Sequence, residues 1–319
     1  MGPMSNYPAG FSQGITIRGV PLNVLHPGKV FWVGNATAAA LQGHRGNSDG
    51  NDGSFQNPFA TVAKALTACV ASRGDVIMLK PGHAESGGTA AWLSFNVAGV
   101  AIVGLGTGSL RPKFTSNTAI TATIAISGAN MSFYNVQFEA NFADITTLLD
   151  IAATADNLTF DQCWFTEAAA NMNFLACITM ATGVDHLTIN NCKFQALDVA
   201  VTSFITGVAH NGLYIYDSEF YMTGVQTVAT GLIVTTGNAL NVDIRNCNMV
   251  SFVDGAIFFD FQGTANRGTI SNCYLSSNDA AGAITAGFNF TGGHVFECYV
   301  AGEPDSFGLV GGGTVYNNA

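Results

Sequence analysis

One pattern of apolar and polar positions returns along the chain at intervals of 25 to 29 residues. Each copy places two apolar residues at period two, then a polar residue, a small residue, and a further apolar residue two positions on. The small residue occupies the same slot in seven copies, at Val136, Cys163, Cys192, Ser218, Cys247, Cys273 and Cys298. A fixed period of this length in strand-like sequence predicts a solenoid, in which each repeat buries its apolar face against its neighbours.

The phase of the repeat predicts a corner in every copy. Leu187 and Ile189 are spaced for one face of a strand, and Cys192 and Phe194 resume that spacing after a slip of one residue at Asn191. In a straight strand such a slip would turn the following side chains to the opposite face. The chain must therefore bend at the polar residue, and Asn and Asp tolerate the left-handed backbone of such a bend. The predicted ladder of corner residues consists of Asn135, Asn191, Asp217, Asn246 and Asn272.

A third apolar run precedes the copies, as at 147–149, 176–178 and 203–205. Three short strands per turn, with about 4.8 Å between successive turns, describe a parallel β-helix. We expect it to be right-handed, because parallel crossover connections nearly always are. The predicted fold class is therefore all-β, a right-handed parallel β-helix of about nine coils.

Cysteine fills the small slot in five copies, at Cys163, Cys192, Cys247, Cys273 and Cys298. Because Ser218 and Val136 fill the same slot elsewhere, the position selects for size and burial. We therefore expect reduced thiols stacked in the interior. Disulfides and a metal site are the alternatives, although no CxxC or Cys/His spacing typical of metal ligands occurs.

The segments that flank the repeats predict caps and an arm. Asn57 and Pro58 match the N-cap and first position of a helix that Gly74 ends, and this helix would cover the open end of the solenoid. The predicted organisation is an extended arm over 1–35, a polar loop and capping helix over 36–74, the β-helix over 75–300 and a tail over 301–319.

The N-terminal arm contains two short strand-like runs, 14–18 and 29–33. We expect it to dock on a neighbouring subunit or a larger assembly. The residues expected to make that contact are Phe11, Ile15, Ile17, Arg18, Phe31 and Trp32. The alternative is a strand that only pads the first coil of the solenoid.

Composition narrows the range of partners. The 319 residues are 48% hydrophobic, and 11 Lys and Arg against 21 Asp and Glu give a net charge of −10. This balance disfavours nucleic acid as a partner. The sequence contains neither a polybasic patch nor an apolar stretch long enough to span a membrane, so no membrane partner is expected. The N-terminus lacks a basic region followed by an apolar core, so we expect no secretory signal.

Two segments resemble known families. The entry segment of the pectin lyase-like right-handed parallel β-helix superfamily is similar to Asn57–Val62, Ala65-Leu66, Gly74–Gly82 and the turn Gly104–Gly108. That superfamily includes lyases, hydrolases and purely structural proteins. The opening of tailed-phage virion proteins, among them head decoration proteins, is similar to Tyr7–Phe11, Ile15–Leu22 and Pro27–Val33.

The basic residues of the repeats do not form a recognisable catalytic site. A pectate-lyase-like site needs an acidic calcium cluster and an arginine, but Lys193, Arg245 and Arg267 have no concentrated acidic patch beside them. The clustered aspartates of polygalacturonase-like hydrolases are also missing from the sequence. We therefore expect no enzymatic activity and no cofactor.

Two pairs of titratable residues remain as candidates. Asp156 and Asp185 share a column on adjacent coils, about 5 Å apart, which is the spacing of a retaining glycosidase pair. Both lie in turns, where Asp is a common turn former, and that role is the simpler interpretation. His83 and Glu85 follow the first strand and could face a cleft, although we expect them to be surface residues.

The favoured hypothesis is a structural protein of a phage virion, made in the bacterial cytoplasm and carried on the particle surface as a head decoration protein. Its expected partners are the major capsid protein or another virion protein, and further copies of itself in a homotrimer. The alternative is a tailspike or adhesin that binds or cleaves a bacterial surface glycan, or a pectinase-like lyase or hydrolase. For that alternative, the sequence offers an outward slot that holds Trp164, Tyr274 and Tyr299, interrupted by Lys193, Glu219 and Asn248.

Overall fold

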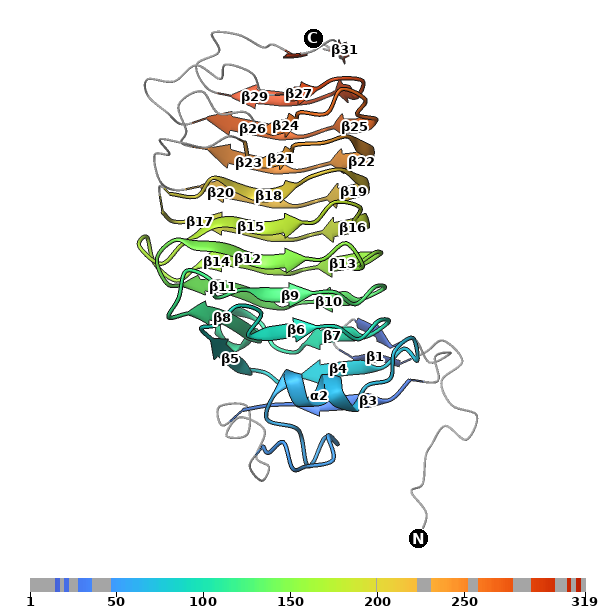
Figure 1. Ribbon diagram of the computed structural model, residues 1–319, viewed down its shortest axis with the longest axis vertical. Helices are drawn as coiled ribbons and strands as arrows, with labels where there is room; N and C mark the ends of the chain where they lie inside the picture. Colours follow the sequence, from blue (N-terminus) through green and yellow to red (C-terminus); the bar gives the residue numbers. More distant parts are fainter. Residues whose placement is uncertain are drawn as a thin grey trace.

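The computed structural model describes residues 15–17, 20–22, 28–35, 47–198, 200–222, 231–251, 258–277, 288–301, 309–310 and 314–316. They form an elongated solenoid of stacked coils, with three sheets along its length (Figure 1). Neighbouring strands in all three sheets pair in parallel. The predicted parallel β-helix is therefore confirmed.

The strands of each sheet follow one another from the N-terminal to the C-terminal end of the solenoid. Sheet 1 contains β3 (Val30–Val33), β4 (Val76–Leu79), β7 (Ala101–Gly104), β10 (Ser132–Tyr134), β13 (Leu158–Asp161), β16 (Asp185–Asn190), β19 (His210–Tyr216), β22 (Ala239–Arg245), β25 (Gly268–Ser271), β28 (His294–Phe296) and β31 (Thr314–Tyr316). Sheet 2 contains β5 (Ala84–Gly87), β8 (Lys113–Asn117), β11 (Gln137–Asn141), β14 (Trp164–Glu167), β17 (Lys193–Ala196), β20 (Glu219–Met222), β23 (Asn248–Ser251), β26 (Tyr274–Ser277) and β29 (Tyr299–Ala301). Sheet 3 contains β6 (Leu93–Phe95), β9 (Ile124–Ile126), β12 (Ile145–Ile151), β15 (Phe174–Met180), β18 (Ser203–Gly207), β21 (Ile233–Thr235), β24 (Phe259–Phe261), β27 (Phe288–Phe290) and β30 (Leu309–Val310).

The corner between sheets 1 and 2 lies at the polar residue of each repeat. All five residues of the predicted ladder have a positive φ, between 50° and 54°. Gln162 and Glu297 occupy the same corner in two other coils, also with a φ of 54°. The left-handed residue turns the chain while the side chains on both sides of it stay inward, which is why the apolar period slips by one residue there.

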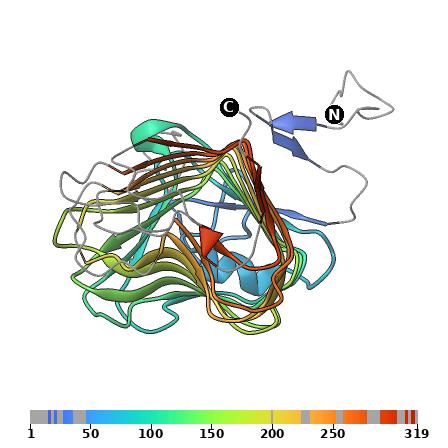
Figure 2. The ribbon, with the colours of Figure 1, turned by 90° about the horizontal axis from the view of Figure 1, so that it is seen from above.

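The core is a set of side-chain columns that run along the solenoid axis, and Figure 2 shows the three sheets enclosing one interior. The aromatic column of sheet 2 includes Phe165, Phe194 and Phe220, none of them exposed to solvent. Phe194 stacks on both neighbours, with ring centroids 4.4 Å from Phe165 and 4.5 Å from Phe220. Register within a sheet thus aligns identical side chains, and offset stacking of aromatic rings adds to their burial.

The cysteines of the small slot line the same interior. Cys163, Cys192, Cys247 and Cys273 are buried, Cys298 is half-buried, and all five are unpaired thiols. Each thiol donates a hydrogen bond to a backbone carbonyl, for example Cys192 Sγ to Asn190 O at 3.3 Å. Burial raises the pKa of Cys192 well above its usual value. A thiol held in this way stays protonated and packs as a small apolar group.

The entry helix α2 (Val62–Ala68) begins later than the sequence pattern indicates. Thr61 is its N-cap and accepts a hydrogen bond from the Lys64 N–H at 3.2 Å, so the assignment of Asn57 as N-cap was wrong. Asp49 holds Thr61 in place, because its carboxylate accepts from both the backbone N–H and the hydroxyl of Thr61. The helix lies at the N-terminal end of the solenoid, over β3 and β4 (Figure 1).

The boundaries of the arm and the tail also differ from the prediction. β3 is the first strand of sheet 1 and pairs with β4, so Phe31 and Trp32 belong to the first coil, as the padding-strand alternative had it. Ile15 lies in β1 (Ile15–Ile17) together with Ile17, and β1 pairs antiparallel with β2 (Val20–Leu22). Phe11 and Arg18 lie outside the described residues. Beyond residue 300, β30 and β31 extend sheets 3 and 1 into the predicted tail.

Candidate functional site

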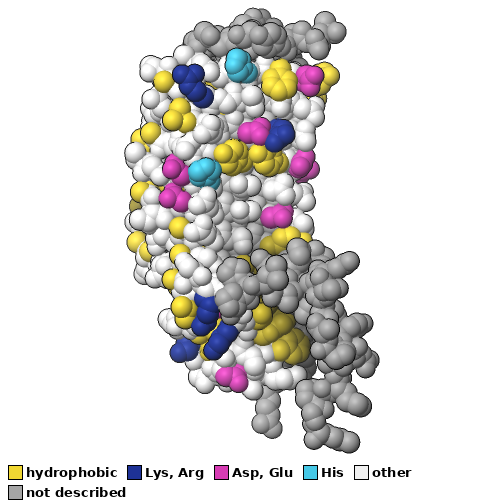
Figure 3. All heavy atoms as spheres, turned by 90° about the vertical axis from the view of Figure 1, so that its right-hand side faces the viewer, with side chains coloured by type: hydrophobic (Ala, Val, Ile, Leu, Met, Phe, Trp, Pro, Cys, Tyr) yellow, Lys and Arg dark blue, Asp and Glu magenta, His cyan; other side chains and the backbone are white. Residues whose placement is uncertain are grey.

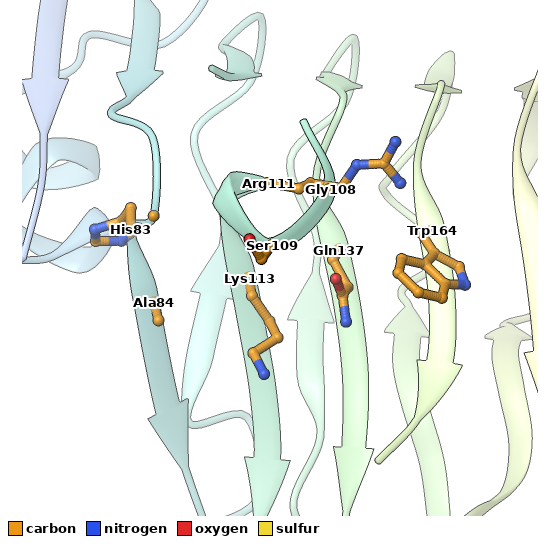
Figure 4. Close-up of a pocket in the computed structure, with 9 residues that line it drawn as sticks. His83, Ala84, Gly108, Ser109, Arg111, Lys113, Gln137 and Trp164 are labelled. Carbon is orange, nitrogen blue, oxygen red and sulfur yellow. The ribbon is translucent and has the colours of Figure 1, made fainter. Parts of the chain in front are cut away.

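A pocket of about 320 Å³ opens on the outer side of sheet 2, near its N-terminal end. Its wall comes from β5, β8, β11 and β14 together with the one-turn helix η1 (Gly108–Leu110), which arches over the start of β8 (Figure 4). The lining residues are Gly82, His83, Ala84, Gly108, Ser109, Arg111, Lys113, Gln137 and Trp164.

The η1 arch is held against the preceding coil by backbone hydrogen bonds. The Gly82 N–H donates to Leu110 O at 2.8 Å, and the Lys113 N–H donates to His83 O at 2.9 Å. At Gly106, φ is 106° and a Cβ would lie 2.4 Å from Leu110 O, so only glycine fits at the start of the arch. The position of the pocket therefore depends on contacts between consecutive coils.

Arg111 is one of two basic residues that line the pocket. Its Nε donates to Asn135 Oδ1 at 3.0 Å, and its guanidinium carbon lies 6.0 Å from the ring centroid of Trp164. Asn135 in turn donates from Nδ2 to the carbonyls of Gly104 and Gly106, at 2.9 and 2.8 Å. The guanidinium is thus oriented by a corner residue on one side and an indole face on the other, and its terminal nitrogens make no hydrogen bond within the described residues.

Lys113 supplies a second cation, one strand away from Gln137. Its Nζ donates to Glu139 Oε1 at 2.9 Å, and the side chain of Lys113 is 36% exposed whereas that of Glu139 is 12% exposed. Glu139 also accepts from Thr115 Oγ1 and Gln137 Nε2, both at 3.2 Å. Lys113 therefore lines the pocket, while its partner Glu139, on the same outward face of β11 as Gln137, is held in a hydrogen-bonded network.

Trp164 forms the C-terminal wall of the pocket, on the same row of outward residues as Lys113 and Gln137 (Figure 4). The indole is half-buried, and its Nε1 has no hydrogen-bond partner among the described residues. A flat aromatic face beside two cations and an amide is an arrangement that can bind a ring with both apolar C–H groups and charged substituents.

His83 and Glu85 are not surface residues, contrary to the expectation from sequence. His83 is completely buried, and its Nε2 donates to Glu85 Oε1 at 2.7 Å. That oxygen also accepts from the Val62 N–H at the start of α2, again at 2.7 Å. In Figure 4 the imidazole points away from Lys113 and Trp164. The pair therefore links the turn beside the pocket to the entry helix.

A buried lysine supports the same region from the side of the polar loop. Lys80 Nζ donates to Phe55 O at 2.6 Å and lies 4.2 Å from the Phe55 ring centroid. Burial lowers the pKa of Lys80 to about 8. The contact ties the loop that precedes α2 to the end of β4.

None of the other candidates from the sequence lines the pocket, although Lys193 lies on the strand next to Trp164. Asp156 and Asp185 are on adjacent coils, and the Asp185 N–H donates to Asp156 Oδ1 at 2.9 Å, which is a turn-stabilising role. Arg245 pairs with Asp243 at 2.7 Å, and Lys193 pairs with Glu219 at 3.7 Å. Figure 3, which shows the right-hand side of Figure 1, has both signs of charge scattered over the surface.

The corner ladder is joined by side-chain hydrogen bonds over part of its length. Asn272 Nδ2 donates to Asn246 Oδ1 at 2.6 Å, and Asn246 Nδ2 donates to Asp217 Oδ1 at 3.0 Å. At the N-terminal end Asn135 bonds to the η1 arch and Arg111 instead. One member of the structural ladder thus also holds Arg111, a residue that lines the pocket.

Arg111 and Lys113 were missed as functional residues in the sequence. The clear copies of the repeat begin at Met131, and both residues precede that point. A usable signal was present, because Lys113-Phe114-Thr115 has the same outward–inward–outward pattern as Gln137-Phe138-Glu139 on the next coil.

The described part of the chain contains no cluster of three or more His, Cys, Asp or Glu that could hold a metal ion. Over the same residues, no helix is long and apolar enough to cross a membrane.

No protein-family profile and no curated protein matches the sequence. Among solved structures, a rhamnogalacturonan lyase is 13% identical with a TM-score of 0.44, covering 91% of this chain and 84% of its own. A pectin methylesterase mutant in complex with a hexasaccharide is 11% identical with a TM-score of 0.50, covering 82% and 90%. A pectate lyase is 12% identical with a TM-score of 0.49, covering 87% and 77%.

These matches contradict the expectation of no enzymatic activity and support the expectation of a pectin lyase-like fold. The pectin methylesterase, at a TM-score of 0.50, is named as an enzyme, which contradicts the expectation of a chain without enzymatic activity. None of them is named as a phage or capsid protein, so the resemblance of the N-terminal segment to virion proteins receives no support from them. At identities of 11 to 13% the likeness is one of fold. The chain has the fold of pectin lyase-like parallel β-helix proteins.

Proposed function

We propose that this chain is a carbohydrate-active β-helix protein that binds an acidic polysaccharide in the pocket on sheet 2 and cleaves it by β-elimination. The observation that carries the proposal is the convergence of Arg111, Lys113 and Trp164 in one open pocket. The indole offers a stacking surface for a sugar ring, and the Arg111 guanidinium suits the carboxylate of a uronic acid.

The reaction follows from the groups that line the pocket. β-Elimination needs a cation beside the sugar carboxylate and a base for the proton on the adjacent carbon. In this proposal Arg111 binds the carboxylate and the side-chain amine of Lys113 takes the C5 proton. The C–H electron pair becomes the C4=C5 double bond, and the C4–O bond breaks with its electron pair on the departing oxygen. Water protonates that oxygen, so one product has an unsaturated end and the other a free hydroxyl.

Hydrolysis is less well supported by the same pocket. A glycosidase of the usual kind needs two carboxyl groups on either side of the scissile bond. The residues that line the pocket include no Asp or Glu, and the nearby Glu139 is hydrogen-bonded to three side chains, those of Lys113, Thr115 and Gln137. The polar groups in the pocket favour β-elimination.

The biological setting of this activity is a separate proposal. The similarity of residues 7–33 to virion proteins supports a particle-borne protein of the tailspike or adhesin kind, and a glycan on the bacterial surface would then be its substrate. A head decoration role has no support in the matches to solved structures, and the homotrimer and the capsid partner remain predictions from that N-terminal similarity.

The test is incubation of the full chain with polygalacturonate, alginate, heparin and bacterial capsular polysaccharides. The readout is the ultraviolet absorbance of an unsaturated uronate. We expect product with at least one of them. Lys113→Ala should lower the rate by about 100-fold or more, and Arg111→Ala should weaken binding as well. Arg245→Ala, on sheet 1, is the matched control and should leave the rate unchanged.

New reducing ends without unsaturation would indicate hydrolysis instead, and no binding to any acidic glycan would refute the proposal.

A further inference from the structure

The row of outward residues that includes Trp164 continues along sheet 2 far beyond the pocket. Strand pairing places Trp164 beside Lys193, Lys193 beside Glu219, Glu219 beside Asn248, Asn248 beside Tyr274 and Tyr274 beside Tyr299. We call these six residues the sheet 2 column. They are the first residues of six consecutive strands, so the column runs parallel to the solenoid axis.

Two tyrosines at the C-terminal end of the column are unusually exposed. The side chain of Tyr274 is 47% exposed and that of Tyr299 is 66% exposed, although most of the aromatic residues whose burial the structure describes lie in the core. They occupy adjacent strands, which are about 4.8 Å apart, so their rings can form one continuous surface. Two neighbouring aromatic rings with polar ends are typical of binding surfaces rather than of solvated faces.

The residues between Trp164 and Tyr274 are polar. Lys193 and Glu219 form an exposed pair at 3.7 Å, with side chains 49% and 59% exposed, and Asn248 follows on the next strand. An exposed pair of this kind contributes little to stability, so its charges can be re-bonded to a ligand at low cost. Trp164 and Tyr274 are four strands apart, about 19 Å at the usual strand spacing. That span matches a chain of a few linked sugar rings.

We infer that the sheet 2 column is an extended binding track for the same acidic polysaccharide, with Tyr274 and Tyr299 as a second stacking platform remote from the pocket. The inference rests on the proposed function of the pocket. The polysaccharide lies along the solenoid axis, with one sugar ring on Trp164 and others on the two tyrosines. Hydroxyl and carboxylate groups of the intervening sugars bond to Lys193, Glu219 and Asn248.

The track predicts that affinity depends on ligand length. Disaccharides and octasaccharides prepared from polygalacturonate, alginate and heparin are titrated calorimetrically into the full chain, at a pH where cleavage is not detected. The wild-type chain should bind the long oligosaccharide of its preferred series more tightly than the short one. The double variant Tyr274→Ala/Tyr299→Ala should lose about tenfold in affinity for the long oligosaccharide and nothing for the short one.

Two variants separate the track from the pocket. Arg111→Ala should weaken the binding of short and long oligosaccharides alike, because it acts at the pocket. Tyr214→Ala, an outward tyrosine of sheet 1, is the matched control and should bind both as the wild type does. Light scattering of every variant records the oligomeric state.

Each contrary outcome overturns a different statement. If the tyrosine double variant binds long oligosaccharides as well as the wild type does, the track is wrong while the pocket stands. If that variant changes the oligomeric state and not the affinity, the tyrosines contact a second copy of the chain and the track is also wrong. If the wild type binds no oligosaccharide of any series, the pocket and the track fail together.

Discussion

The guanidinium of Arg111 is oriented by Asn135, whose Oδ1 accepts from Arg111 Nε at 3.0 Å. Asn135 is at the same time a corner residue with a φ of 53°, and it holds two carbonyls of the loop that leads to η1. A residue that the repeat needs for its geometry therefore also positions a group in the candidate site. The solenoid and the pocket share this side chain.

Replacing Asn135 should affect both stability and binding. Asn135→Ala places an alanine in a left-handed backbone conformation that asparagine adopts more readily, and it removes three hydrogen bonds. We therefore expect a loss of about 2–4 kcal/mol in the free energy of unfolding. Glycan affinity should fall as well, because Arg111 loses its partner. Chemical denaturation and calorimetric titration measure the two effects.

Asn272→Ala is the control for that substitution. Asn272 has a φ of 50° in the same corner, but its Nδ2 donates to Asn246 and it lies far from the pocket. It should lose stability and retain affinity for short oligosaccharides, which bind at the pocket. Equal losses of affinity in both variants would show that Asn135 acts through the fold and not through Arg111.

His210 should make the protein sensitive to acid. It is 5% exposed, both ring nitrogens lack partners among the described residues, and burial lowers its pKa to about 4, against a smaller opposing effect of Asp185. Because the pKa in the folded state is below the unfolded value of 6.5, the stabilising contribution is complete above pH 6.5. It is lost as pH falls towards 4, by about 3 kcal/mol in total.

The measurement is the free energy of unfolding as a function of pH for wild type and His210→Leu. The variant should lose less stability between pH 6.5 and 4 than the wild type loses. His294→Leu, at an exposed position, is the control and should follow the wild-type curve. Superimposable curves for all three proteins would contradict a buried neutral His210.

Glu167 should have the opposite pH dependence. Burial raises its pKa to about 7, even though its carboxyl group accepts from the backbone N–H groups of Leu197 and Asp198 at 2.6 and 2.8 Å. A folded pKa above the unfolded value of 4.5 means that the contribution is complete below pH 4.5 and is lost as pH rises through 7, by about 3 kcal/mol. Glu167→Gln, which stays neutral, should remove this loss between pH 5 and 8 in denaturation experiments. A variant that keeps the wild-type slope would show that the folded carboxyl is ionised throughout.

The aromatic column should be a main source of stability in the central coils. Phe194 is fully buried and stacked between Phe165 and Phe220, so Phe194→Ala should cost about 3–5 kcal/mol. Phe194→Leu, which keeps most of the volume, should cost about 1 kcal/mol. Hydrogen exchange should locate the loss in the coils on either side of Phe194, because the repeats of a solenoid are stabilised mainly by their neighbours. A uniform increase in exchange over the whole chain would contradict this local effect.

The sequence alone determined the repeat, its corners and its inward faces. The period-two spacing of Leu187 and Ile189, and the slip at Asn191, are properties of neighbouring residues, and the pleat and the left-handed corner act over that same short range. The alternation also limits the register of the parallel strands, since a shift by one residue would place apolar side chains outside.

Only the tertiary structure decided which of the remaining side chains meet. Lys113 and Glu139 are 26 residues apart, and Arg111 and Asn135 are 24 apart, so their contacts depend on how η1 folds back on the preceding coil. His83 is buried and held by Glu85, which binds the start of α2, and no local pattern around His83 reveals this. The sequence around Phe31 is equally compatible with a free arm, and only the pairing of β3 with β4 assigns Phe31 to the first coil. Local spacing sets the face to which a side chain points, whereas burial and partners depend on segments distant in sequence that cover that face.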